Sequence, residues 1–221
     1  MPLVAAAVCP HPPLLVPQVA AGAAGELDEL RAACESAVRP LSAADTVLVI
    51  GADTRTHKYS PPFGGSLAPW GVDRPIGEPG GEKLPLSLLI GAWLRPDATG
   101  FVSVAADATA AECAALGQSL AADGNVGLLV MGDGSARRTE KAPGYLDPRA
   151  EPFDRAVTTA LAKADVDALL ALDPILAADL LVAGRAPWQV LAGAARNAGL
   201  AGEVLFDAAP YGVAYIVASW R

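Results

Sequence analysis

The chain has 221 residues, 52% of them hydrophobic, and 16 Lys and Arg against 24 Asp and Glu give a formal net charge of -8. This length and the even distribution of apolar residues favour a single domain spanning residues 1–221. The negative charge opposes the phosphate backbone of nucleic acids, so a nucleic-acid-binding protein is not expected.

The cysteines and the N-terminal segment indicate a cytoplasmic protein. Cys9, Cys34 and Cys113 are odd in number, widely spaced and without a CxxC pair, which favours neither a disulfide framework nor a zinc knuckle. The first 25 residues carry no Asp, Glu, Lys or Arg, but they also lack a basic segment, and the prolines at positions 10, 12, 13 and 17 interrupt any apolar helix. We therefore expect no export signal and, since no apolar stretch is long enough for a bilayer, no membrane partner.

Short apolar runs alternate with helical patterns along the chain. The apolar runs predict strands at Leu3–Val8, Thr46–Ile50, Phe101–Ala105, Val126–Met131, Val204–Phe206 and Val213–Ser219. Helical spacing predicts helices at Glu26–Arg39, Leu84–Leu94, Thr109–Ala122, Phe153–Ala162 and Trp188–Asn197. Asp165 and Asp173 are typical caps of two further helices, the second closed by Gly184. The alternation predicts an α/β fold, a three-layer α/β/α sandwich with a mostly parallel central sheet and an antiparallel edge.

The segment from residue 60 to residue 83 has no periodicity and is dense in Pro and Gly. Loops of this length usually have a purpose, so we interpret it as a lid or pocket wall, with Trp70 placed to cover an apolar ligand. A decorative or disordered insertion is the alternative.

Polar residues follow three predicted strands, at the edge where open α/β sheets bind ligands. His11 stands in a proline-rich turn after the first strand, Asp53 lies just beyond the second and precedes His57 by four residues, and Asp133 and Ser135 follow Val126–Met131. Each has a structural alternative, because a loop histidine often bonds to backbone and Asp or Ser often stabilises a turn. No Walker loop, GxGxxG, GxSxG or HExxH motif is present.

Five segments taken in order resemble the class III extradiol ring-cleavage dioxygenase (LigB-like) superfamily, to which the Memo proteins also belong. They are PHPPLLVPQV at Pro10–Val19, VLVIGAD at Val47–Asp53, MGDGSARR at Met131–Arg138, APGYLDPRAEPFDRAV at Ala142–Val157 and APYGVAYIVA at Ala209–Ala218. The resemblance implies an α/β/α fold and, in active members, a non-haem Fe(II) held by two His and one Glu, with a further His as acid and base.

The resemblance places few of these groups on this chain. The first metal ligand is His11, and the second falls on Asp53, with His57 as a substitute if the loop shifts register. The acid/base position is Ala136, which cannot transfer a proton. The Glu ligand falls near Val182, with Asp179 one helical turn earlier as the acidic substitute.

We therefore expect a catalytically degenerate protein, without a confident catalytic residue and without a cofactor, whose cleft binds a small molecule or a protein. The expected cleft residues are His11, Asp53, His57, Trp70, Asp133, Ser135 and Arg137, the last either as an anion-binding lip with Arg138 or as part of a solvated pair. The alternative is an active dioxygenase with an unusual ligand set, such as His11, Asp53 and His57, holding Fe(II) or Zn(II). A metal-free hydrolase or transferase would need a nucleophile with an adjacent base, and none is visible. Assembly into a homo-oligomer is left open.

Overall fold

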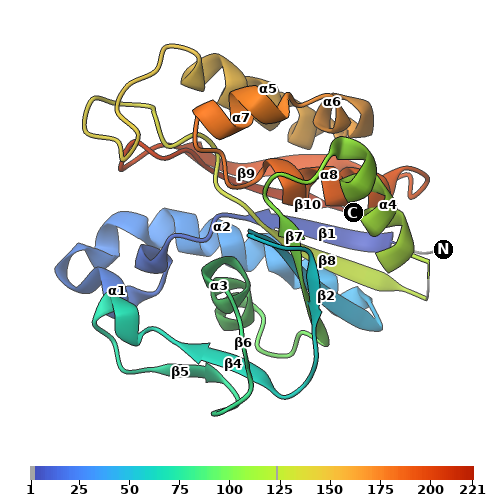
Figure 1. Ribbon diagram of the computed structural model, residues 1–221, viewed down its shortest axis with the longest axis horizontal. Helices are drawn as coiled ribbons and strands as arrows, with labels where there is room; N and C mark the ends of the chain where they lie inside the picture. The colour runs from blue at the N-terminus through green and yellow to red at the C-terminus, as the bar shows by residue number, and fades with distance from the viewer. Residues whose placement is uncertain (1–2, 123) are drawn as a thin grey trace.

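The computed structural model describes residues 3–122 and 124–221, and these form a seven-stranded mixed sheet in the order β3-β7-β2-β8-β1-β10-β9 (Figure 1). Strands β7, β2, β8 and β1 are parallel to one another. At one edge β3 pairs antiparallel with β7, and at the other edge β10 pairs antiparallel with both β1 and β9. The strands are β1 (Leu3–Cys9), β2 (Thr46–Asp53), β3 (His57–Tyr59), β7 (Gly100–Ala105), β8 (Val126–Met131), β9 (Gly202–Ala208) and β10 (Tyr215–Trp220). The predicted α/β fold is confirmed, with antiparallel strands at both edges rather than at one.

Helices cover both faces of this sheet (Figure 1). On one face lie α1 (Pro17–Ala20), α2 (Asp28–Val38) and α3 (Leu86–Leu94), together with the short 3-10 helices at Pro13–Leu15, Ala21–Leu27 and Arg39–Ala43. On the other face lie α4 (Ala110–Leu120), α5 (Ala150–Lys163), α6 (Val166–Leu170), α7 (Pro174–Asp179) and α8 (Arg185–Ala195). Because side chains alternate along a strand, Val8 packs against the α8 face and Cys9 against the α2 face. In the described ranges, no helix has the length and apolar composition needed to cross a bilayer.

The segment from residue 60 to residue 83, predicted to be a loop, contains short strands instead. In the described chain β4 (Phe63–Ser66), β5 (Pro75–Gly77) and β6 (Glu82–Lys83) form a small sheet in the order β5-β4-β6, followed by α3, and a 3-10 helix at Ala68–Trp70 joins β4 to β5. Gly77 has φ of 73°, and a Cβ there would lie 2.4 Å from the Phe63 carbonyl oxygen. Strands that depend on glycine for close approach carry no alternation of apolar side chains, which is why the prediction was wrong.

The capping residues were predicted with one exception. The carboxylates of Asp165 and Asp173 accept backbone N–H groups at the starts of α6 and α7. Gly184, however, precedes α8, and α7 ends at Asp179. A Cβ on Gly184 would lie 2.1 Å from the Trp188 ring, so this glycine permits close packing rather than ending a helix.

Helices α4 and α8 contact each other through a glycine that we expect to be sensitive to substitution. A Cβ on Gly117 would lie 2.0 Å from the Val190 carbonyl oxygen, and backbone cannot move aside as a flexible side chain can. Gly117→Ala should therefore lower the free energy of unfolding by about 1–3 kcal/mol. Each kcal/mol should lower Tm by about 2–4 °C. Gly22→Ala is the control for thermal unfolding, because nothing lies within 4 Å of its Cβ. Equal Tm values for the two variants would contradict this close helix packing.

Candidate functional site

The turns after β1 and β8 bring His11 and Asp133 together. Cys9 pairs with Met131, the last residues of two neighbouring parallel strands, and the Gly132 N–H donates to the Cys9 carbonyl at 2.9 Å. The His11 backbone N–H donates to Asp133 Oδ1 at 2.8 Å, and the ring atom Nδ1 lies 3.6 Å from the same oxygen. One carboxylate therefore fixes the backbone of His11 by a hydrogen bond and lies beside its ring at the carboxyl edge of the sheet.

The His11 ring has few other partners. Its side chain is 12% exposed and that of Asp133 16% exposed. Nδ1 is buried without a hydrogen-bond partner, and Nε2 makes no hydrogen bond with any residue in the described ranges. Nε2 is thus the ring nitrogen available to a ligand.

Tyr215 lies near Asp133, and Tyr211 lies near Tyr215. Tyr215, at the start of β10, is buried on the same face of the sheet as Cys9. Burial raises its pKa well above the usual value, and the negative charge of Asp133 and the nearby Tyr211 raise it further. The Tyr211 hydroxyl donates to Glu26 Oε2 at 2.9 Å, and this bond raises the pKa of Tyr211. Both phenols therefore stay protonated at neutral pH. Neither was predicted as a site residue, although both lie in the APYGVAYIVA segment.

Tyr211 also lines a cavity of about 580 Å³ beside this cluster. The other lining residues come from the segment after β8 and from the turn before β10, namely Thr139, Glu140, Lys141, Pro210 and Gly212. The Arg138 N–H donates to the Gly212 carbonyl at 3.0 Å, which links the two segments. A small ligand in this cavity would contact Tyr211.

A buried carboxylate on α5 fixes the loop that carries Asp133. Asp154 Oδ1 accepts the Ser135 N–H at 2.8 Å, and its Oδ2 accepts the Ser135 hydroxyl at 2.5 Å. Arg138 Nη1 lies 3.3 Å from the same Oδ2. Burial raises the pKa of Asp154, and the hydrogen bonds from Ser135 and the charge of Arg138 oppose that shift. Ser135, expected to line the cleft, is instead fully buried, because its polar atoms face Asp154.

Arg137 folds the loop back on itself and Arg138 pairs with Asp154, so these two arginines do not form the expected anion-binding lip. Arg137 Nη1 donates to the Gly144 carbonyl, and its own carbonyl accepts the Asp147 N–H at 3.0 Å. The Ala136 N–H donates to the Leu180 carbonyl at 3.0 Å. These bonds tie the segment after β8 to the end of α7.

Asp53 and His57 do not join His11. Asp53 ends β2, and strands β8 and β1 follow it across the sheet, so about 10 Å separates its strand from β1. His57 lies in β3, about 19 Å from β1 at the usual strand spacing. Its Nε2 lies 2.6 Å from Glu82 Oε1 in the small sheet. The hydrogen bonds from the Ser60 N–H and from His57 lower the pKa of Glu82. The interpretation of His57 as a cleft residue or iron ligand is therefore corrected, since Glu82 already pairs with it.

Asp179 and Val182 have partners other than His11, and Trp70 is exposed. Asp179 Oδ2 is 3.3 Å from Arg149 Nη1, and Arg149 in turn bonds Asp147, which lowers the pKa of Asp147 to about 2. The Val182 N–H donates to the Ala177 carbonyl at 2.9 Å, and the side chain packs against the core. Trp70 is 37% exposed in the 3-10 helix between β4 and β5.

The residues of this site do not fit an iron centre of the kind that the sequence motifs imply. Such a centre needs three converging donors. His11 and Asp133 lie side by side, but within residues 3–122 and 124–221 no group of three His, Cys, Asp or Glu side chains is close enough to hold a metal ion. Val182 and Ala136 offer no side-chain donor at all.

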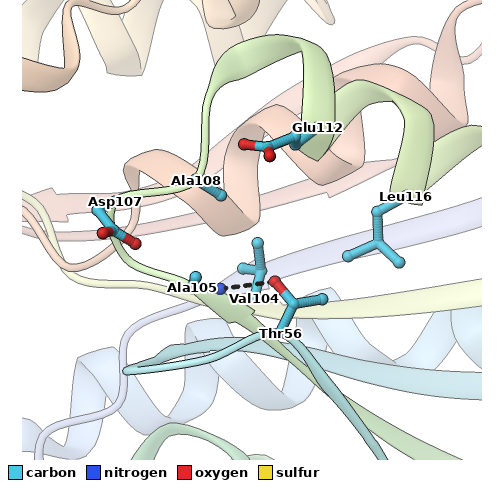
Figure 2. A pocket seen from close by; sticks show the side chains of 7 residues that line it. All are labelled: Thr56, Val104, Ala105, Asp107, Ala108, Glu112 and Leu116. Carbon is cyan, nitrogen blue, oxygen red and sulfur yellow. Dashed lines mark hydrogen bonds between the residues drawn. The ribbon is translucent and has the colours of Figure 1, made fainter.

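A second cavity, of about 450 Å³, lies at the end of β7 on the opposite, α4-covered face (Figure 2). Figure 2 shows the carboxylates of Asp107 and Glu112 at its wall, with the Ala105 N–H donating to the Thr56 hydroxyl at 3.0 Å. The Glu112 carboxylate is already used, since it accepts the Thr109 N–H and hydroxyl at the start of α4. This cavity holds none of the residues that converge at His11.

Comparisons with known proteins give a similar fold and no family. No family model matches the chain, and no curated protein matches it. The crystal structure of uncharacterized protein JW3007 from Escherichia coli K12 is similar, with a TM-score of 0.58 and 13% sequence identity over 98% of each chain. At this identity the similarity shows the α/β architecture over nearly the whole chain.

Proposed function

We propose that the protein binds a small hydroxylated aromatic molecule at the site formed by His11, Asp133, Tyr211 and Tyr215, as a catalytically degenerate relative of the extradiol dioxygenases that its motifs resemble. The observation that carries the proposal is the His11 ring, held beside Asp133 while its Nε2 makes no hydrogen bond with the described residues. A positioned histidine with one unused nitrogen at the carboxyl edge of an α/β sheet is suited to a ligand.

The proton positions follow from the charges around the ring. A carboxylate 3.6 Å from Nδ1 favours the tautomer with the proton on Nδ1, which leaves a lone pair on Nε2. Nε2 then accepts a hydrogen bond from a ligand hydroxyl. The protonated phenol of Tyr215 is suited to donate to a second ligand oxygen, since the Tyr211 hydroxyl already donates to Glu26 Oε2. A ring with two adjacent hydroxyls has donors and acceptors in this arrangement.

Binding without metal is supported by the lack of a third converging donor in the described residues. The proposal assigns His11 a role in binding and positioning, and it assigns no bond-breaking step.

The experiment uses the fact that the chain has two histidines. In the presence of a metal chelator, catechol is titrated into the protein, and the histidine ring resonances are followed by NMR. We expect the His11 resonances to shift and those of His57 to stay. His57 pairs with Glu82, and its strand β3 lies about 19 Å from β1 across the sheet.

Two variants assign the signals and test the proposal. His11→Gln should weaken catechol binding by about 10-fold, the order expected for one lost hydrogen bond and the gap left by the ring. His57→Gln is the matched control and should bind catechol like the unmodified protein. Unchanged His11 resonances at saturating catechol, or equal binding to His11→Gln, would refute the proposed site.

A further inference from the structure

A third cavity, of about 320 Å³, lies between the small sheet and the end of α3. Its wall includes residues from β4, from the β4–β5 segment, from α3 and from β7, and the principal ones are Phe63, Arg74, Ile76, Leu84, Trp93 and Phe101. The volume is at the lower end of the range for small-molecule sites, enough for one or two fused rings.

The walls of this cavity are aromatic and fixed. The Phe63 and Phe101 rings are in edge contact, with centroids 4.5 Å apart and an interplanar angle of 64°. Phe101 is 2% exposed and Leu84 3% exposed, so the inner wall is part of the core. Such walls favour a flat, apolar ring over a flexible chain.

One cation stands at the rim of these apolar walls. Arg74 is exposed, and among the described residues its guanidinium forms no salt bridge and no hydrogen bond. A guanidinium binds a carboxylate through two parallel hydrogen bonds, and its fork of donors matches that shape. Arg74 therefore supplies an unpaired positive charge at this cavity, although the whole chain has a net charge of -8, and this charge favours an anionic ligand over a neutral one.

This cavity is separate from the His11 site. Phe101 is the second residue of β7 and pairs with Val49 in the middle of β2, whereas His11 follows the carboxyl end of β1. Strands β2 and β8 stand between β7 and β1, a separation of about 14 Å across the sheet.

We propose that this cavity is a second binding site, for a planar aromatic carboxylate whose ring lies between the Phe63, Trp93 and Ile76 side chains and whose carboxylate pairs with Arg74. The segment from residue 60 to residue 83, interpreted from the sequence as a lid or pocket wall, supplies Arg74 and Ile76. The site is independent of the one at His11.

The probe is 2-naphthoate, measured by calorimetry on the full chain, with 2-naphthalenemethanol as the uncharged analogue of the same ring. We expect 2-naphthoate to bind with a Kd of about 1 mM or tighter, as is usual for a ligand of this size. Arg74→Gln should weaken it by about 10-fold or more, because a charged hydrogen-bond pair is lost. The alcohol should bind the unmodified protein about as weakly as 2-naphthoate binds Arg74→Gln.

Matched variants separate this site from others. Arg196→Gln removes an exposed arginine whose nearest carboxylate is 3.9 Å away, and it should leave 2-naphthoate binding unchanged. His11→Gln should also leave it unchanged. Ala92→Leu fills the cavity and should abolish binding of 2-naphthoate. If that variant does not fold, Arg74→Gln still tests the site, because Arg74 is exposed and its substitution leaves the core unchanged. The proposal would be overturned if 2-naphthoate did not bind at a concentration 10 times the expected Kd, or if Arg74→Gln bound it with the same Kd as the unmodified protein.

Discussion

Catechols will not be ring-opened at an appreciable rate by the unmodified protein after anaerobic loading with Fe(II) and addition of oxygen. Ala136 stands where the proposed resemblance to extradiol dioxygenases would place the proton-transfer histidine, and loss of such a group typically costs about 10²–10⁴ in rate. Val182 stands where the same resemblance would place a carboxylate ligand, and its side chain packs against the core. Since both losses affect the same chemical step, the rate should fall by more than either alone.

The assay follows the yellow ring-fission products of a catechol panel. The double variant Ala136→His, Val182→Glu is tested in parallel, with Ala136→Asn, Val182→Gln as a control of similar size that restores neither group. Activity in the first double variant alone would support a degenerate site on an intact fold. Robust activity of the unmodified protein would show that the ligands are misplaced, and His57 and Asp179 would be the first to re-examine.

Asp154→Ala will destabilise the protein more than any exposed carboxylate substitution on the same helix. Asp154 is 1% exposed, and its removal leaves the buried N–H and hydroxyl of Ser135 without acceptors and Arg138 without its partner. Buried groups that lose a partner in this way cost about 3 kcal/mol in free energy of unfolding. At about 2–4 °C per kcal/mol, Tm should fall by about 6–12 °C.

The control is Glu151→Ala, also on α5, which removes an exposed pair with Arg155 and should change the stability by less than about 0.5 kcal/mol. Asp154→Asn keeps an oxygen acceptor for the Ser135 N–H and should fall between the two. Because Asp154 fixes the loop that carries Asp133, the folded Asp154→Asn protein should also bind catechol more weakly. Equal unfolding midpoints for Asp154→Ala and Glu151→Ala would contradict the role assigned to this carboxylate.

The local patterns of the sequence determined six of the seven strands of the main sheet, most helices and the two Asp caps. Val126–Met131 is apolar throughout and forms β8 within these bounds, because a strand covered on both faces needs no polar side chain. The same reasoning predicted that His11 and Asp133 follow strand ends, where parallel strands bring their turns to one edge. The architecture of the main sheet could therefore be predicted from patterns among residues close together in the chain.

The tertiary structure alone decided which polar groups remain available. His57 and Glu82 are 25 residues apart and Ser135 and Asp154 are 19 apart, and in each pair the partner removes a residue that the sequence had assigned to the cleft. Arg74 and Phe101 reach one cavity only because β4–β6 form a small sheet beside α3 and β7. A polar side chain binds whichever group packing places within about 3 Å, and that distance depends on the arrangement of whole elements, which local periodicity does not contain.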